Sequence, residues 1–527
     1  MTTAASSQRA GAVGFRSERG PILISLMLAT SLVALDSTIV ATAVPSIVAD
    51  LGGFSQFPWL FSVYLLAQAV SVPVYGKLSD LFGRKPIMLF GIGLFLLGSI
   101  LCGFAWSMPA LIAFRAVQGL GAGAVQPMSV TIAGDIYTLA ERAKAQGYLA
   151  SVWAMSAVVG PTLGGLFAQY LTWRWIFFVN IPLCALAAWM LIRRFHETVR
   201  PRVRRRIDYL GSVTLTAGCT LIILGLLEGG QAWAWNSVTS VLVLVTGALL
   251  IAIFIAVQRR VPDPVLPLWI FSRRVLLASA VVALLVGAVL LGLTTYVPTF
   301  VQVVLGTGPL VAGFALATLT IGWPISAALS GRFYLRLGFR TTALIGCVLV
   351  IIGAGWCTLL GQGSTVWEVA GCCFVIGLGM GLVASPTLIA AQSSVGWAER
   401  GVVTANNLFS RSIGSAVGVA VFGAIANATL GAATAASGAG SGGGSTAGPA
   451  APAALAQAAH DVFLAALLLA VVMFAAAWLL PGGRPTPLQR SGDRSADPSA
   501  DPSADPAERD GQRDPDPVPD HGPGGLT

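Results

Sequence analysis

The sequence predicts an all-α integral membrane protein with fourteen transmembrane helices, arranged as two related six-helix bundles with two additional helices between them. Three observations predict this fold: the composition, the distribution of Lys and Arg, and an internal repeat. Of the 527 residues, 55% are hydrophobic and 10% are charged, and the mean hydropathy is +0.79. Soluble domains carry about 25% charged residues, so the composition excludes an ordinary soluble domain.

Apolar segments recur along the whole chain, and each is long enough to cross a hydrocarbon core of about 30 Å as a helix. A Gly- and Trp-rich break, LLEGGQAWAWNS, separates the seventh segment from the eighth. The expected helix cores are 21–45, 57–76, 86–106, 109–132, 146–170, 174–192, 209–228, 237–257, 275–301, 310–330, 341–360, 367–390, 404–428 and 461–480.

The positions of Lys and Arg orient these helices. With the N-terminus in the cytoplasm, 28 of the 31 fall on the cytoplasmic side, two lie inside spans, and only Arg174 lies outside. This asymmetry follows the positive-inside rule, so we expect both termini in the cytoplasm and a multi-pass protein in the plasma membrane. The Arg-rich, Lys-poor and Ala-rich composition favours a bacterial source. The net charge of +9 then reflects topology, and we expect no nucleic-acid partner.

Composition and hydropathy divide the chain into segments, and two of them are not membrane core. We expect a flexible external loop at 431–454, where Gly, Ala and Ser dominate, and a disordered tail at 481–527, rich in Asp and Pro. The expected segments are a cytoplasmic N-terminus (1–20), an N-terminal six-helix bundle (21–192), a basic cytoplasmic loop (193–208), two additional helices (209–257), a cytoplasmic loop (258–274), a C-terminal six-helix bundle (275–480) and the tail.

The basic loop after the sixth span holds seven Arg within 193–206. It either anchors the topology or binds anionic lipid headgroups. All seven Cys lie in apolar spans without metal-ligand spacing, and no Walker loop or nucleophile constellation is present. The sequence therefore predicts no enzyme, no metal, no other cofactor and no ATP-driven transport, and we expect a monomer.

An internal repeat relates the first six spans to the last six. The pairs Gly76 and Gly331, Gly119 and Gly377, and Gly160 and Gly414 are separated by 255, 258 and 254 residues, respectively. Parallel repeats of this kind place a substrate site near the middle of the membrane, between the halves. The charges do not repeat, because Leu335 stands opposite Asp80, Cys373 stands opposite Arg115, and the ninth span has no acid to match Asp36.

Five motifs resemble those of the major facilitator superfamily, and specifically its fourteen-span drug/proton antiporter family. In chain order they are LDSTIVATAVP (35–45), GKLSDLFGRK (76–85), RAVQGLGAG (115–123), SAVVGPTLGG (156–165) and WRWIFFVNIP (173–182). The resemblance spans about residues 20 to 480 and implies the major facilitator fold and alternating-access transport. Two departures are Ala41, where that family often has Asn, and the loop 330–340, which lacks the acid of its first-half counterpart.

Asp36 and Arg115 are charges inside the membrane. Counting 1.5 Å per residue puts them roughly 8 Å and roughly 10 Å below the outer edge of the hydrocarbon core. Such charges are costly and mark functional sites. The pair is either a static ion pair that stabilises packing or a proton-coupling site, in which burial favours the neutral carboxyl of Asp36 and Arg115 favours its charged form.

The loop between the second and third spans carries Gly76, Asp80, Gly83, Arg84 and Lys85. Its charges and glycines are accounted for by topology and turn chemistry alone. The family resemblance implies a gate that opens and closes on the cytoplasmic side.

Four residues of the fifth span, Gly160, Pro161, Gly164 and Gly165, form the motif associated with antiporters. They either provide close helix packing or, as the resemblance implies, a flexure point that limits leak.

Several polar residues lie in spans and are candidates for lining a cavity. They are Gln68, Gln118, Gln126, Asn406, Asn407 and Arg411. Arg411 either snorkels to the inner interface or contacts substrate or gate.

The leading hypothesis is a proton-coupled antiporter that exports amphipathic small molecules, namely drugs or antibiotics, by alternating access. One alternative is an exporter of a specific endogenous metabolite, lipid or siderophore, or a solute importer. Another is a transport-dead membrane scaffold or sensor, which would have no need of intramembrane charges.

Overall fold

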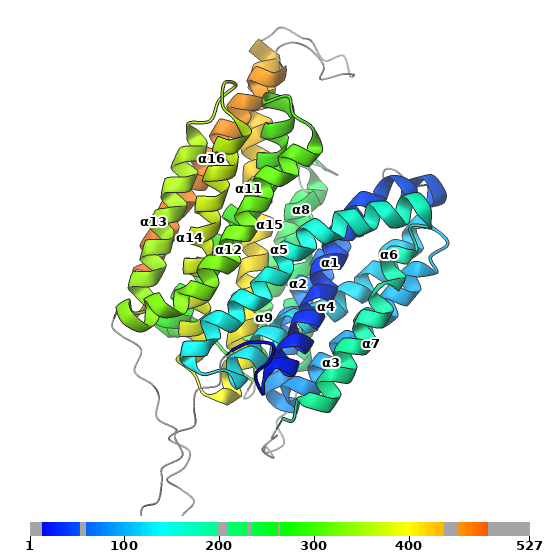
Figure 1. The fold of residues 1–527 in the computed structure, drawn as a ribbon, viewed down its shortest axis with the longest axis vertical. Coiled ribbons are helices and arrows are strands. Elements are labelled where there is room, and N and C mark those ends of the chain that lie inside the picture. Colours follow the sequence, from blue (N-terminus) through cyan, green and yellow to red (C-terminus); the bar gives the residue numbers. More distant parts are fainter. Residues whose placement is uncertain are drawn as a thin grey trace, which may run out of the picture. The chain divides into compact units, whose positions relative to one another are not determined.

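The computed structural model describes residues 13–52, 59–197, 208–228, 233–261, 264–436 and 451–482, and these residues form helices and no strands (Figure 1). Thirteen helices of the described residues are long and apolar enough to cross a membrane. The remaining expected span corresponds to α5, a helix of 32 residues. The expected all-α membrane fold is therefore confirmed.

The N-terminal bundle contains the first six spans. Its sixth span is two helices, because the ring of Pro182 would clash with the carbonyl of Phe178, four residues before it. The helices are α1 (Gly20–Leu51), α2 (Trp59–Phe82), α3 (Arg84–Gly103), α4 (Met108–Ile136), α5 (Leu139–Tyr170), α6 (Trp175–Phe178) and α7 (Asn180–Arg194).

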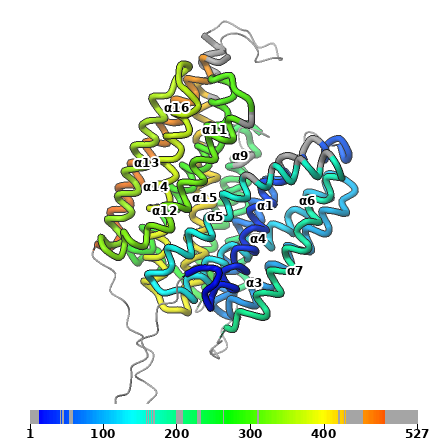
Figure 2. The backbone as a smooth tube through the Cα atoms, in the orientation of Figure 1, coloured from blue at the N-terminus to red at the C-terminus, as the bar shows by residue number. Residues whose placement is uncertain are grey.

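The C-terminal bundle contains the last six spans, which Figure 2 shows in green to orange apart from the blue and cyan N-terminal helices. Its first span ends in a π-helical turn, η2, directly after Pro298. The elements are α10 (Trp269–Ser272), α11 (Arg274–Thr299), η2 (Phe300–Val304), α12 (Pro309–Leu337), α13 (Phe339–Thr358), α14 (Val366–Ser393), η3 (Trp397–Glu399), α15 (Arg400–Ala436) and α16 (Ala451–Ala477).

The two additional helices are α8 (Tyr209–Glu228) and α9 (Val238–Gln258). Helix α8 packs against α9 and also against α2 and α15, so it touches both bundles. Its residues Leu215, Cys219 and Ile223 share one hydrophobic cluster with residues of α2 and α15. Helix α9 leaves a row of apolar side chains exposed, as a lipid-facing helix does: Val238, Val241, Leu242, Val245 and Leu249.

The glycines of the repeat occupy equivalent places in the two bundles. Gly83 joins α2 to α3 at φ +99°, and Gly338 joins α12 to α13 at φ +89°. A Cβ at Gly121 would lie 2.3 Å from the backbone N of Phe95 on α3, and one at Gly379 would lie 2.6 Å from the carbonyl of Gly346 on α13. In both bundles, therefore, neighbouring helices pack closely at equivalent glycine positions, where a Cβ would not fit.

We call the end of the helices at Gly83, Tyr137, Gly338 and Ser394 the basic end, because the Lys- and Arg-rich connections meet there. Residues 1–12 lie outside the described residues, as do residues 198–207 of the basic loop (193–208), most of the loop 431–454 and the tail after Gly482.

Candidate functional site

Asp36 of α1 and Arg115 of α4 are in contact inside the N-terminal bundle. The side chain of Asp36 is completely buried and that of Arg115 is 1% exposed, and Nη1 of Arg115 lies 2.5 Å from Oδ2 of Asp36. Gln118 donates from Nε2 to Oδ1 of Asp36 at 2.8 Å. Both oxygens of the carboxylate therefore have a donor, as a buried carboxylate requires.

Further hydrogen bonds extend this contact to α3 and α7. Gln118 also donates to Oγ of Ser99 at 2.8 Å, and Asn180 donates to the same oxygen at 3.2 Å. Arg115 donates to Gln118 at 2.8 Å, and its guanidinium lies 4.1 Å from the centre of the Tyr64 ring. We call Asp36, Arg115, Gln118, Ser99 and Asn180 the Asp36 network. It joins four helices of one bundle.

The Asp36 network corrects one expectation and adds two residues. Gln118 was expected to line a cavity, but it is completely buried in this network. Ser99 and Asn180 were not singled out, because neutral polar residues are common in spans and nothing in their spacing points to Asp36. Among the described side chains, Nη2 of Arg115 and the hydroxyl of Tyr64 have no hydrogen-bond partner. The network therefore keeps unused hydrogen-bonding capacity beside Arg115.

At the basic end, Asp80 of α2 binds the first turn of α15 in the other bundle. Its two oxygens accept hydrogen bonds from the backbone N–H groups of Gly401 at 3.1 Å and Val402 at 2.8 Å. A carboxylate at a helix N-terminus is favoured by the helix dipole as well as by these bonds. Asp80 therefore holds the bundles together at this end.

Two arginines complete this contact between the bundles. Arg84 lies 2.8 Å from Asp80 and 3.2 Å from Asp135 of α4, while Arg400 of α15 lies 2.9 Å from Asp135. Arg84 also donates to the carbonyl of Trp397 at 2.5 Å and stacks over the ring of that residue. We call Asp80, Arg84, Asp135 and Arg400 the charge cluster. Asp135 and Arg400 were missed because they lie far from the motif in sequence.

The other residues of this loop have separate roles. A Cβ at Gly76 would lie 2.3 Å from Cβ of Ala405, so only glycine permits this approach of α2 to α15. Gly83 turns the chain at φ +99°, and the following backbone N–H groups of Arg84 and Lys85 donate to Glu197 at 2.8 and 2.9 Å. The ammonium of Lys85 caps the end of α7 by donating to the carbonyl of Ile192 at 3.0 Å. Lys85 therefore stabilises its own bundle.

A second contact between the bundles joins α5 to the C-terminal bundle. Arg142 donates to Oγ of Ser393 at 3.1 Å, and the hydroxyl of Tyr334 donates to the carbonyl of Leu139. A Cβ at Gly331 would lie 2.8 Å from Cβ of Ala143, which mirrors the contact at Gly76. Both contacts lie at the basic end, so the bundles are closed together there.

The antiporter-like motif lies in the second half of α5, away from the basic end, and α5 is helical throughout. A Cβ at Gly160 would lie 2.0 Å from Oγ1 of Thr38 on α1, so the bare backbone of α5 packs directly against this side chain. Thr38, which lies two residues after Asp36 in sequence, donates to the carbonyl of Ser156 at 3.0 Å. Gly164 is buried, and the side chains of Pro161 and Gly165 lie outside the described part of the structure.

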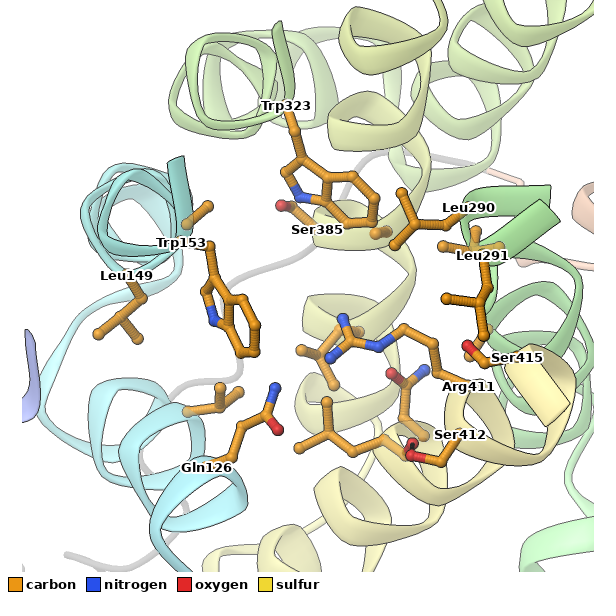
Figure 3. Close-up of a pocket in the computed structure, with 18 of the residues that line it drawn as sticks. Gln126, Leu149, Trp153, Leu290, Leu291, Trp323, Ser385, Arg411, Ser412 and Ser415 are labelled. Carbon is orange, nitrogen blue, oxygen red and sulfur yellow. Dashed lines mark hydrogen bonds between the residues drawn. The ribbon is translucent and has the colours of Figure 1, made fainter. Parts of the chain in front are cut away.

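A cavity of about 480 Å³ lies between the bundles (Figure 3). Gln68, Gln126, Asn407 and Arg411 line it. Gln68 donates to Gln126 at 2.9 Å. Asn406 is buried and does not line the cavity, contrary to expectation, because it lies on another face of α15 from Asn407. Apolar and aromatic side chains make up most of the remaining wall, including Leu149, Trp153, Leu290, Leu291, Trp323 and Ile223 of α8.

Asp36 does not line the cavity, although its helix does. Thr30 of α1 is part of the wall, and it lies six residues before Asp36, or about 9 Å along the helix axis. The Asp36 network and the cavity are therefore separate sites that share α1 and α4, since Gln126 and Arg115 both lie on α4.

At the opposite end from the charge cluster, Asp50 forms a half-exposed ion pair. Arg174 lies 2.7 Å from Oδ2 of Asp50, and the indole N–H of Trp173 donates to the same oxygen at 3.0 Å. The hydrogen bonds from Trp173 and Arg174 lower the pKa of Asp50 from its ordinary value. Arg174 therefore has a carboxylate partner at the end of the helices away from the basic end.

Comparison with known proteins gives three results. The model of the Major Facilitator Superfamily matches residues 26–419. Multidrug resistance protein 3 of Bacillus subtilis (strain 168) is 34% identical over 394 residues, or 75% of this chain and 77% of that protein. Multidrug transporter protein MdtP of the same strain is 34% identical over 402 residues, 76% and 74% of the two chains.

The fold is also similar to a solved structure. The crystal structure of the human organic anion transporter MFSD10 (TETRAN) matches 87% of this chain and 99% of its own with a TM-score of 0.61. The sequence identity is 14%, so this likeness concerns the fold alone.

Proposed function

The chain belongs to the Major Facilitator Superfamily, and on that premise we propose that it is a proton-coupled antiporter that exports amphipathic drugs or antibiotics from a bacterial cytoplasm. It is a multi-pass membrane protein whose bacterial relatives are named as multidrug transporters. The names of those relatives support the substrate class, and the intramembrane charges support the proton coupling.

The orientation comes from the basic end, which the positive-inside rule assigns to the cytoplasm. In that orientation the charge cluster and the contact between α5 and α12 close the cavity toward the cytoplasm. The structure then corresponds to an outward-facing state, in which the cavity releases substrate outside. Alternating access requires these contacts to open and the opposite ends to close.

The observation that carries the proposal is the complete burial of Asp36 against Arg115. A proton that reaches Asp36 neutralises the carboxylate and leaves Arg115 without its counter-charge. Because an unpaired buried charge is strongly unfavourable, the bundle lowers its free energy by moving α1 relative to α4 or by admitting water. Both helices also line the cavity, so the protonation of Asp36 is linked to its shape.

The exchange has a clear energetic driving force. Each proton that enters a cell with an inside-negative potential gains about 2.3 kcal/mol per 100 mV. Transport of one proton per substrate is therefore sufficient to concentrate a neutral substrate outside.

The test is Asp36→Asn in proteoliposomes with an imposed pH gradient. Asparagine keeps the size and one acceptor of Asp36 but cannot exchange a proton at pH 7. We expect proton-driven export to be lost, while exchange of substrate for substrate persists. Asp50→Asn, which removes a carboxylate from the same helix outside the network, is the matched control and should transport normally. Unchanged coupling in Asp36→Asn would refute the proton-coupling role of Asp36.

A panel of substrates in everted vesicles separates broad drug export from export of a single metabolite.

A further inference from the structure

Building on the proposed export function, we propose that the cavity selects amphipathic anions, whose acid group binds Arg411 and whose aromatic body lies between Trp153 and Trp323. This narrows the substrate class from amphipathic molecules in general to aromatic organic anions, such as carboxylates, sulfonates and phenolates.

Arg411 is held in the middle of the cavity wall. It lies eleven residues into α15, or about 16 Å from the start of that helix at the basic end. A Cβ at Gly287 of α11 would lie 2.0 Å from the carbonyl of Arg411, so the backbone is fixed by direct contact between α11 and α15. Figure 3 shows the side chain of Arg411 extending into the cavity toward Gln126. This geometry argues against simple snorkelling.

Among the described residues, no carboxylate is paired with Arg411. Its side chain is partly buried and forms no hydrogen bond or ion pair with another side chain of the described residues. It is also the only charged residue among the described residues that line the cavity. A guanidinium in mostly apolar surroundings is unfavourable without a partner, and it carries five N–H donors that require acceptors. An acid group on the substrate would supply both the charge and the acceptors.

The described residues that line the cavity include no carboxylate to balance a cationic group. The intramembrane carboxylate of Asp36 does not line the cavity, and its two oxygens already bind Arg115 and Gln118. A cation in the cavity would therefore meet the positive charge of Arg411 with no carboxylate to compensate. The arrangement repels cations as well as attracting anions, which is how a binding site achieves discrimination.

Two indole rings define the place of the apolar part of the ligand. Trp153 of α5 and Trp323 of α12 project into the cavity from opposite bundles (Figure 3). Their faces can stack on an aromatic ring while Gln126 and Ser415 supply polar contacts near Arg411. A volume of about 480 Å³ suits a ligand of drug size.

The test compares two xanthene dyes of opposite charge, fluorescein (anionic) and rhodamine 6G (cationic). Binding to the full chain in nanodiscs of neutral phosphatidylcholine is followed by dye anisotropy at pH 7.4. We expect fluorescein to bind at least about tenfold more tightly than rhodamine 6G.

Arg411→Gln should weaken fluorescein binding by about tenfold, and it should leave the affinity for rhodamine 6G unchanged or raise it. Arg411→Lys, which keeps the charge, should retain most of the affinity for fluorescein. Arg332→Gln, which removes an exposed arginine of α12, is the control and should bind both dyes as the wild type does.

Two results would overturn the proposal. One is a wild-type preference for rhodamine 6G, which needs no variant and therefore decides the question even if Arg411→Gln does not fold. The other is an equal loss of both dyes in Arg411→Gln, which indicates a structural role. Because equilibrium binding needs no pH gradient, the outcome is independent of proton coupling. If fluorescein binds as expected but a pH gradient drives no export, the proposed antiport fails and the anion site remains.

Discussion

The two bundles share one backbone plan but differ in their buried chemistry. Gly121 and Gly379 make the same kind of contact, yet Arg115 of the first bundle is replaced by Cys373 in the aligned position of the second, where it belongs to a fully hydrophobic core. The geometry of a six-helix bundle therefore does not need the Asp36 network. This difference suggests that the network is retained for what its charges do.

The bundles also contribute different charges to the cavity and its closure. The N-terminal bundle supplies the acids of the charge cluster, Asp80 and Asp135, and the C-terminal bundle supplies Arg400 and the helix N-terminus that they bind. The C-terminal bundle alone supplies Arg411, which forms no ion pair with the described residues. The contact between the bundles therefore joins acids of the N-terminal bundle to donors of the C-terminal bundle.

The largest expected effect comes from breaking the Asp36 network. Arg115→Met keeps much of the volume but leaves the carboxylate of Asp36 buried and unpaired, which should lower the free energy of unfolding by about 3–5 kcal/mol. Thermal unfolding in detergent measures this loss. Cys373→Ala at the aligned position, which removes one small buried group, should cost about 1 kcal/mol. Equal losses at the two positions would contradict the distinction between the bundles.

The next prediction tests the shared backbone plan. Gly121→Ala and Gly379→Ala each place a methyl group against backbone atoms, at 2.3 and 2.6 Å, respectively. We expect each substitution to lower the free energy of unfolding by about 1–3 kcal/mol and by similar amounts. The reason is that the new methyl group meets backbone atoms, which cannot move aside as a flexible side chain could. Gly313→Ala has open space around its Cβ and is the control. A large effect at only one of the two positions would show that the packing is not equivalent.

An effect of similar size is expected at the charge cluster. Asp80→Asn keeps an acceptor for the α15 N–H groups but removes the charge. We expect this change to destabilise the closed arrangement, relative to the arrangement open at the basic end, by about 1–3 kcal/mol. The population open at the basic end should rise, and the distance between spin labels at positions 82 and 337 should lengthen. Leu335→Asn, at the matching position of the second half, is exposed and should leave the distances unchanged. No change in Asp80→Asn would show that other contacts hold this end closed.

The smallest effect concerns Asp50. Its pKa is lowered in the folded protein, so it stabilises the fold above the ordinary value of 3.8, and this contribution is lost as the pH falls through the folded pKa. Asp50→Asn should therefore be slightly less stable than wild type at pH 7 and equal to it in strong acid. Because the side chain is 48% exposed, solvent screens the pair and the difference should be small. Melting temperatures across this pH range measure it, and a difference that grows in acid would be inconsistent with this sign.

Much of the fold was predictable from the sequence, because hydropathy, Lys and Arg asymmetry and paired glycines are local or periodic signals. The sequence also placed Asp36 and Arg115 at similar depth from helix rise alone. It could not assign Gln118 to their network, because the face on which Gln118 lies depends on where α1 crosses α4. For the same reason it did not separate Asn406 from Asn407, or identify Asp135 and Arg400 as partners of the loop motif. Such partners are set by the packing of helices distant in sequence.

Helix α8 has a mechanical consequence for transport. It contacts α2 in one bundle and α15 in the other, and Ile223 reaches the cavity wall. When the bundles rotate against each other, α8 cannot remain fixed to both, so one of its two surfaces must slide. The sliding contacts in its cluster are short or aliphatic side chains such as Ala69, Cys219 and Ala416, which can exchange neighbours without breaking hydrogen bonds. Under the proposed alternating access, α8 would therefore act as a sliding seal that keeps lipid chains out of this side of the cavity.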